Sequence, residues 1–149
     1  LHESPLAGEA RERGAELAQW LAADAPPGIH CWSGETTVTL GDALGDAHGQ
    51  GGRCQEFALA AAITLEASGK LARSLTLLAA GTDGRDGPTD AAGAIVDAAT
   101  APAVRAHGLE PAELLARHDA HRALDAAHAL LRTGHTGTNV ADIVIALVA

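Results

Sequence analysis

The sequence predicts a single α/β domain with three layers, in which helices cover both faces of a mostly parallel or mixed sheet. Short apolar runs alternate with amphipathic helical patterns along the whole chain. The length of 149 residues suits one domain with a real core. With one Phe, two Trp and no Tyr, that core must be built from Ala, Leu, Val and Ile. The many alanines favour helices packed closely on the sheet.

The chain begins with a predicted helix and two predicted strands. Ser4 is expected as the N-cap of a helix over Leu6–Leu21, which has leucines and alanines on one face and ends at the Pro-rich segment 24–28. Ile29–Trp32 and Glu35–Leu40 are expected to form two strands joined by a Ser-Gly turn.

The middle of the chain reads as loop, helix, strand and strand. Residues 41–52 are rich in Gly and Asp and form a long loop of the kind that is often functional. Gln55–Ser68 has a helical pattern closed by Gly69. Ser74–Ala80 reads as a buried strand, and Ala92–Val96 as a further strand.

The last third is mostly helical and ends in a strand. Helices are expected over Thr100–His107, over Pro111–His118 and from Asp119 to Arg132. The histidines among them are interpreted as surface residues, because a zinc site would need tighter spacing. Ile143–Val148 reads as a buried strand.

Charge excludes several classes of partner. Ten Lys and Arg against nineteen Asp and Glu give a formal net charge of -9, which argues against nucleic acid and against anionic membranes. No apolar run approaches a membrane span and no signal pattern opens the chain, so a cytoplasmic protein is expected. Cys31 and Cys54 lie in no paired motif and are expected to be reduced. Because the chain starts at Leu1 without a methionine, we expect it to be processed or cut from a longer protein.

An acidic, glycine-rich loop over Gly81–Asp90 directly follows the buried strand, where ligands usually sit in open α/β sheets. Asp83, Asp86 and Asp90 could hold a hard cation such as Mg²⁺ or accept hydrogen bonds from sugar-like hydroxyls. They could equally cap backbone N–H groups in turns, as Asp does well. The loop itself leaves both interpretations open.

A second candidate site precedes the helix in the middle of the chain. Gly51, Gly52 and Arg53 offer backbone N–H groups, a helix dipole and a guanidinium, which suit a phosphate or a carboxylate. The alternative is a tight turn with Arg53 solvated or paired to Glu56. Glu35 is a candidate site carboxylate, or an exposed glutamate at a strand start.

A polar loop over Thr133–Asn139 could bind an anion through hydroxyl and amide groups, with Thr138 and Asn139 as candidates. It lacks the lysine and the glycine spacing of a P-loop, which excludes a Walker-type nucleotide site there.

Together these loops resemble, in order, the motifs of the MOFRL domain, the C-terminal part of class II glycerate kinases. Members of that family also carry the name hydroxypyruvate reductase. The resemblance spans essentially Leu6 to Val148, and its motifs lie at residues 33–38, 51–56, 81–93 and 133–142.

The resemblance implies an enzyme that uses ATP and Mg²⁺ to phosphorylate D-glycerate, giving 2-phosphoglycerate. It also implies an N-terminal Rossmann-like domain with a key lysine, which this chain lacks, and an active site between the two domains. Residues 1–149 would then be the C-terminal domain, inactive alone, with a homodimer as a further assembly. The implied catalytic residues are Arg53, Asp83 and Asp86, the two aspartates also binding metal, and the implied substrate-binding residues are Glu35, Gly51, Gly52, Asp90, Thr138 and Asn139.

The chain departs from the family pattern in places, and each departure removes a hydrogen-bonding or rigidifying residue. The departing residues are Ser33, Cys54, His118, Ala120, His135 and Ala141. Hydroxypyruvate reductase ranks below the kinase, because no dinucleotide fingerprint follows a strand. The non-enzyme alternative is a binding module for small phosphorylated acids, which calorimetry with 2-phosphoglycerate would distinguish.

Overall fold

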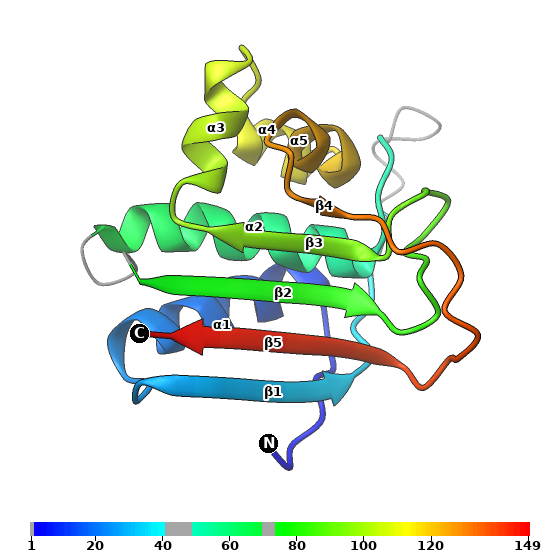
Figure 1. Ribbon diagram of the computed structural model, residues 1–149. Coiled ribbons are helices and arrows are strands. Elements are labelled where there is room, and N and C mark those ends of the chain that lie inside the picture. Colours follow the sequence, from blue (N-terminus) through cyan, green and yellow to red (C-terminus); the bar gives the residue numbers. More distant parts are fainter. Residues whose placement is uncertain (1, 41–48, 70–73) are drawn as a thin grey trace.

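The computed structural model describes residues 2–40, 49–69 and 74–149, which form one α/β unit (Figure 1). A sheet of five strands and a layer of helices make up these described ranges. In chain order the elements are α1 (Ala10–Ala23), β1 (Gly28–Gly34), α2 (Arg53–Ser68), β2 (Leu75–Gly81), β3 (Gly93–Asp97), α3 (Thr100–Ala106), α4 (Pro111–Ala116), α5 (Ala120–Ala126), β4 (Leu130–Leu131) and β5 (Asp142–Val148).

The sheet is antiparallel, so the prediction of a mostly parallel or mixed sheet is wrong. Its order is β1-β5-β2-β3-β4, and every neighbouring pair runs antiparallel. The crossover through α2 does leave β1 and β2 pointing the same way, as alternating strands and helices suggest. The C-terminal strand β5 then inserts between them and runs opposite to both.

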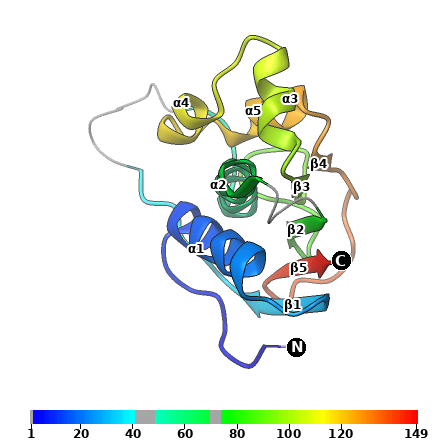
Figure 2. The ribbon, with the colours of Figure 1, turned by 90° about the vertical axis from the view of Figure 1, so that its left-hand side faces the viewer.

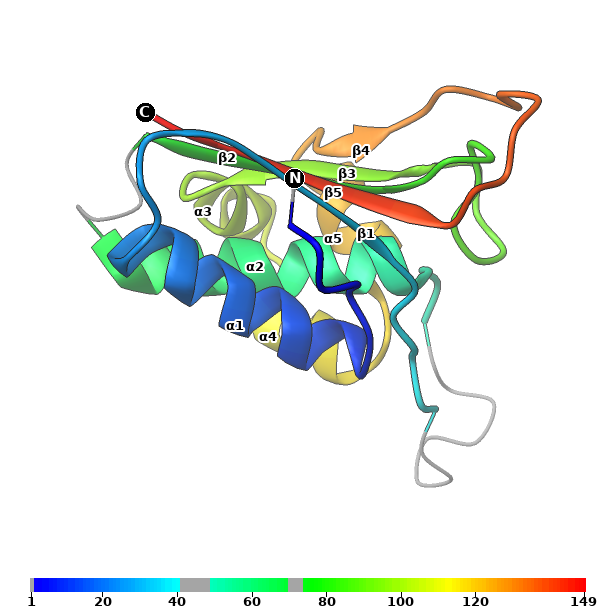
Figure 3. The same ribbon diagram turned by 90° about the horizontal axis from the view of Figure 1, so that it is seen from below.

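The helices cover one face of the sheet, so the domain has two layers rather than the three predicted. Figure 3 shows all five labelled helices on the same side of the strands. Burial alternates accordingly along β2, where Leu75 and Leu77 are buried while Thr76 is exposed. The other face stays open, and Ile29, Ile95 and Leu147 are exposed on the strands there.

Helix α2 is the centre of the core. Figure 2 views it nearly end-on, with α1 below it, α3, α4 and α5 above it, and the strands beside it. Its inner face carries Phe57, which is 1% exposed, and a set of fully buried alanines. A Cβ atom built on Gly14 of α1 would lie 2.2 Å from the carbonyl oxygen of Phe57, so glycine is what lets the two helices approach this closely.

Several predicted elements have different bounds. Helix α1 begins at Ala10 with Glu9 at its N-cap, so neither Ser4 as cap nor a helix from Leu6 is right. Leu6 instead forms a parallel bridge with Gly34 and fills the core. The expected strand Glu35–Leu40 is an irregular segment with one isolated bridge. The backbone of Thr37 forms hydrogen bonds with Gly8 and with Ala10 at the start of α1.

The late helix predicted from Asp119 to Arg132 ends at Ala126, and the chain then forms the short edge strand β4. The predictions for α2, β2, β3 and β5 are confirmed to within two residues at each end. Of the predicted loop 41–52, residues 41–48 lie outside the described residues. None of the helices in the described ranges has the length and hydropathy that a membrane span requires.

Candidate functional site

The candidate site is a cleft of about 760 Å³ at the end of the sheet where β1 and β2 finish and β5 starts. The segment after β1, the start of α2, the loop after β2 and the turn between α4 and α5 supply its walls. The lining residues are Glu35, Thr36, Thr37, Val38, Gly51, Gly52, Arg53, Glu56, Asp83, Arg85, Asp86, Gly87 and His118.

Arg53, the first residue of α2, is held by two carboxylates. Its Nε donates to Asp142 Oδ2 at 2.6 Å and its Nη2 to Asp142 Oδ1 at 3.0 Å. Its third nitrogen, Nη1, lies 3.0 Å from Glu35 Oε1. Hydrogen bonding to Asp142 raises the pKa of Arg53 above its ordinary value, against the effect of partial burial. Arg53 is therefore a fixed cation, paired to Asp142 and Glu35 and not to Glu56.

Asp86 caps helix α2 from the neighbouring loop. Its Oδ1 accepts from the backbone N–H of Cys54 at 3.1 Å and its Oδ2 from that of Gln55 at 2.8 Å. The first-turn N–H groups of Cys54 and Gln55 are thus occupied by a carboxylate of the chain itself, whereas the groups predicted to bind an external anion are those of Gly51, Gly52 and Arg53. A Cβ atom on Gly52 would lie 2.3 Å from Asp86 Cγ, so glycine is required for this close approach.

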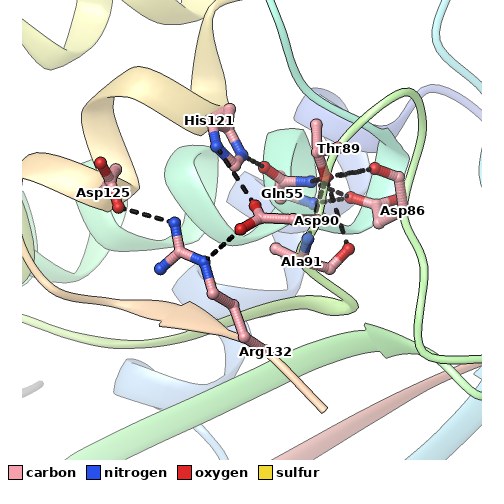
Figure 4. A network of polar contacts seen from close by, with 8 residues as sticks. All are labelled: Gln55, Asp86, Thr89, Asp90, Ala91, His121, Asp125 and Arg132. Carbon is pink, nitrogen blue, oxygen red and sulfur yellow. Dashed lines mark hydrogen bonds and ion pairs between the residues drawn. The ribbon is translucent and has the colours of Figure 1, made fainter. Parts of the chain in front are cut away.

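The cap belongs to a buried polar network (Figure 4). The Gln55 side-chain amide donates to Asp86 Oδ2 at 3.0 Å and to Thr89 Oγ1 at 2.9 Å. Burial raises the pKa of Asp86 above its ordinary value, and the N–H groups of Gln55 and Cys54 oppose that rise. Asp86 is 4% exposed and both of its carboxylate oxygens accept hydrogen bonds. For Asp86 the structure therefore agrees with the second interpretation of the sequence, in which the aspartate caps backbone N–H groups.

Asp83 and Arg85 face the cleft from the same loop. Asp83 Oδ1 accepts the backbone N–H of Arg85 at 3.0 Å, and no bond to Oδ2 is recorded in the described part of the chain. Within that part, the Arg85 guanidinium likewise has no hydrogen bond or ion pair. These two groups are free to meet a ligand.

The residues present do not fit a complete Mg²⁺ site. Among the residues described, no group of three or more His, Cys, Asp and Glu is arranged to hold a metal ion. Of the two predicted metal ligands, Asp86 is committed to the helix cap and Asp83 alone has an unengaged oxygen. One carboxylate would suffice only where nucleotide phosphates and water complete the coordination.

Asp90, Thr138 and Asn139 do not line the cleft. Asp90 accepts from Arg132 Nε at 2.8 Å and lies 3.6 Å from His121 Nε2, and Figure 4 shows these partners beside the Gln55 network. The Arg132 hydrogen bond lowers the pKa of Asp90 below its ordinary value. The loop that carries Thr138 and Asn139 is exposed.

That exposed loop supports the acidic loop from behind. Thr82 Oγ1 donates to the carbonyl of Ala141 at 2.7 Å and accepts from the N–H of Val140 at 2.9 Å. Gly84, with φ of 85°, sits so close that a Cβ atom there would lie 1.9 Å from the carbonyl oxygen of Gly134. The two motifs are therefore one structural unit, of which only the acidic loop faces the cleft.

Sequence reasoning missed the ionic floor of the cleft. Glu56 is 2% exposed, accepts from Arg11 Nε at 2.8 Å, and has its Oε2 2.9 Å from His118 Nδ1. His118 is buried with φ of 55°, so its interpretation as a surface histidine is wrong. Helical spacing could not show this, because Glu56 and His118 are 62 residues apart. Asp142 was equally overlooked as a site residue. It is the last residue of the motif at 133–142, and this membership of a motif was the available signal.

Comparison with known proteins places these motifs in a family. The model of the MOFRL family matches residues 29–142. The chain is 44% identical over 147 residues to D-glycerate 2-kinase of Thermotoga maritima and 41% identical over 150 residues to glycerate 2-kinase of Pyrococcus horikoshii. Those alignments cover 94% and 96% of this chain but 33% and 32% of the relatives, so the chain spans about a third of their length.

The fold agrees with the same relationship. A crystal structure of glycerate kinase from Thermotoga maritima matches with a TM-score of 0.87 at 44% identity, covering 98% of this chain and 35% of that chain. The family match spans more than half of the chain and includes the Arg53 and Asp83 segments. The chain therefore belongs to the MOFRL family.

Proposed function

We propose that this chain is the C-terminal, substrate-side domain of a glycerate 2-kinase that transfers the γ-phosphoryl group of ATP to D-glycerate, giving 2-phosphoglycerate. The observation that carries the proposal is Arg53, a fixed guanidinium directed at a cleft on a chain whose relatives are named glycerate 2-kinases. The cleft lies at one edge of the domain, so a second domain could close it.

Arg53 is proposed to bind the carboxylate of glycerate or the phosphoryl group in transfer. Phosphoryl transfer depends mainly on positioning and on neutralising charge, both of which a guanidinium clamped by Asp142 can supply. Arg85, from the loop after β2 that lines the same cleft, is a second cation for the same ligand.

Asp83 is proposed to orient a hydroxyl group of glycerate through its unengaged oxygen. Glu35, whose exposed carboxylate also lines the cleft, would bind substrate from the β1 side. Asp86, Gly51 and Gly52 would act indirectly, by building the helix start that presents Arg53. Asp90, Thr138 and Asn139 would support the acidic loop from outside the cleft.

The remaining two thirds of the relatives' length is the proposed source of the missing parts. A Rossmann-like N-terminal domain would hold ATP and most of the coordination of Mg²⁺, since of the two predicted metal ligands only Asp83 keeps an unengaged oxygen among the described residues. The isolated chain is then expected to be inactive. A cytoplasmic location and a homodimer are further expectations, which fractionation and sedimentation of the full-length protein would test.

The direct test is Arg53→Ala in the full-length protein. Loss of a charge-assisted hydrogen bond to the ligand, about 1.5–3 kcal/mol, should lower kcat/KM for D-glycerate about 10- to 150-fold. Arg105→Ala is the matched control, because Arg105 is a surface arginine held by Glu66 and Glu110 at the far end of α2. Unchanged turnover and glycerate affinity in Arg53→Ala would refute the assignment.

A further inference from the structure

We infer that Glu35 occupies the ligand position at Arg53 in the free protein, and that a bound anion must displace it. Glu35 thereby becomes a specificity-determining residue, because only a ligand with its own negative charge can replace it. The inference deepens the proposed function, since it concerns the same guanidinium. It rests on how differently the two carboxylates hold Arg53.

Asp142 is a permanent partner of Arg53. Its side chain is 11% exposed and engages two guanidinium nitrogens in a bidentate pair, which is the strong geometry for arginine and carboxylate. Because the Asp142 side chain is nearly buried, loss of the Arg53 guanidinium would leave its charge uncompensated. Asp142 also begins β5, paired to Gly34 of β1 and Gly81 of β2, so its backbone is fixed by both neighbouring strands.

Glu35 is a loose partner of the same guanidinium. Its side chain is 64% exposed, and it meets Nη1 through one oxygen at 3.0 Å. It follows β1 in a segment without regular structure, and exposed single-contact ion pairs are weak and easily exchanged. A carboxylate or phosphate arriving from the cleft could take over Nη1 while Asp142 keeps Nε and Nη2.

Two other anion-binding groups nearby are already used, whereas the Arg85 guanidinium in the same cleft is unpaired among the described residues. The Asp86 carboxylate accepts the backbone N–H groups of Cys54 and Gln55, so the helix start is neutralised from within the chain. Arg11, behind the cleft, is paired with the buried Glu56. Nη1 of Arg53 is therefore the position where an incoming anion competes with a residue that can leave.

Displacement of Glu35 has consequences for selectivity. A neutral polyol offers no charge to replace the carboxylate and should leave the Glu35–Arg53 pair intact. A glycerate carboxylate or a phosphate replaces the charge and also frees Glu35 to accept a hydroxyl hydrogen bond from the ligand. The pair thus rejects glycerol-like molecules, which differ from glycerate by the carboxylate.

The test is an NMR titration of the 149-residue chain with inorganic phosphate, following Arg53 Nε–H and the Glu35 side-chain carboxyl carbon. Both signals should shift with one saturation curve, whereas glycerol should move neither. In Glu35→Gln the Arg53 curve should saturate at a two- to fivefold lower phosphate concentration, the range of an exposed ion pair. Glu66→Gln is the control, because it removes an equal charge from an Arg–Glu pair about 20 Å away at the other end of α2.

The outcomes separate the two proposals. If Arg53 shows no saturable response in any variant, the free chain holds no anion at this position and the displacement is refuted, while the proposed function is judged by Arg53→Ala in the full-length protein. If Arg53 saturates but the Glu35 signal stays still, or if Glu35→Gln and Glu66→Gln behave alike, only the displacement is refuted. As a second measurement in the full-length protein, competitive inhibition by phosphate against D-glycerate should strengthen two- to fivefold in Glu35→Gln and not in Glu66→Gln.

Discussion

Asp86 and Asp83 lie three residues apart in one loop, yet their removal should have opposite kinds of effect. Asp86 is buried and caps α2 with both oxygens, whereas Asp83 is partly exposed and makes one hydrogen bond within the described residues. We predict that Asp86→Ala destabilises the fold and that Asp83→Ala leaves stability nearly unchanged.

The magnitude for Asp86→Ala follows from the groups left behind. Loss of a helix cap costs about 0.5–2 kcal/mol, and each buried donor left unsatisfied costs about 1–3 kcal/mol. The N–H groups of Cys54 and Gln55 both lose their acceptor, while the Gln55 side chain keeps Thr89 Oγ1. A loss of about 3 kcal/mol is expected, against under about 1 kcal/mol for Asp83→Ala.

Urea unfolding followed by tryptophan fluorescence measures both values, because Trp20 and Trp32 lie in and against the core. In a chain of this length the loss should lower Tm by about 10 °C. If Asp86→Ala stays within 1 kcal/mol of the wild type, or if Asp83→Ala is equally destabilised, the capping role is wrong.

Three further predictions concern other parts of the domain. Gly14→Ala should destabilise despite the better helix propensity of alanine, because its Cβ would lie 2.2 Å from the Phe57 carbonyl oxygen; a rise in Tm would contradict the close helix contact. Burial raises the pKa of the Cys54 thiol, so a disulfide reagent at pH 8 should label one thiol per native chain, the half-buried cysteine of β1; rapid labelling of two would contradict this. Arg132 lowers the pKa of Asp90 in the folded state, so Asp90 contributes stability above its unfolded pKa, and this stability is lost as the pH falls through the folded pKa. The difference in stability between the wild type and Asp90→Asn should therefore vanish in strong acid. A difference that does not depend on pH would contradict this prediction.

The elements that the sequence predicts well are those with a strong local pattern. Helix α2 and strands β2 and β5 have continuous apolar runs with glycine or proline nearby, and their bounds are right to within two residues. Strand order is not a local property. The alternation of helices and strands favours a parallel sheet, but nothing within Asp142–Val148 shows that it inserts between β1 and β2.

The local sequence pattern also could not show that the helices cover only one face of the sheet. Strands β2 and β5 are apolar at almost every position, which is typical of strands buried on both faces. In this fold the outward residues Leu78 and Ile145 are partly exposed opposite each other, on a face that the helices leave open. Apolar content therefore overstated the number of layers.

The acidic loop illustrates why site residues are harder to assign than elements. Asp83, Asp86 and Asp90 look equivalent in sequence, but each meets a different part of the fold. Asp86 reaches the start of α2, more than thirty residues earlier, and Asp90 reaches Arg132, more than forty residues later, while Asp83 faces the cleft. Asp86 caps a helix and Asp90 pairs with an arginine, so neither carboxylate is available to bind a ligand. These two aspartates instead stabilise the loop that holds Asp83 in place. The same division separates Asp142 from Glu35 around Arg53: the buried carboxylate orients the guanidinium, and the exposed one occupies the face that a ligand would need.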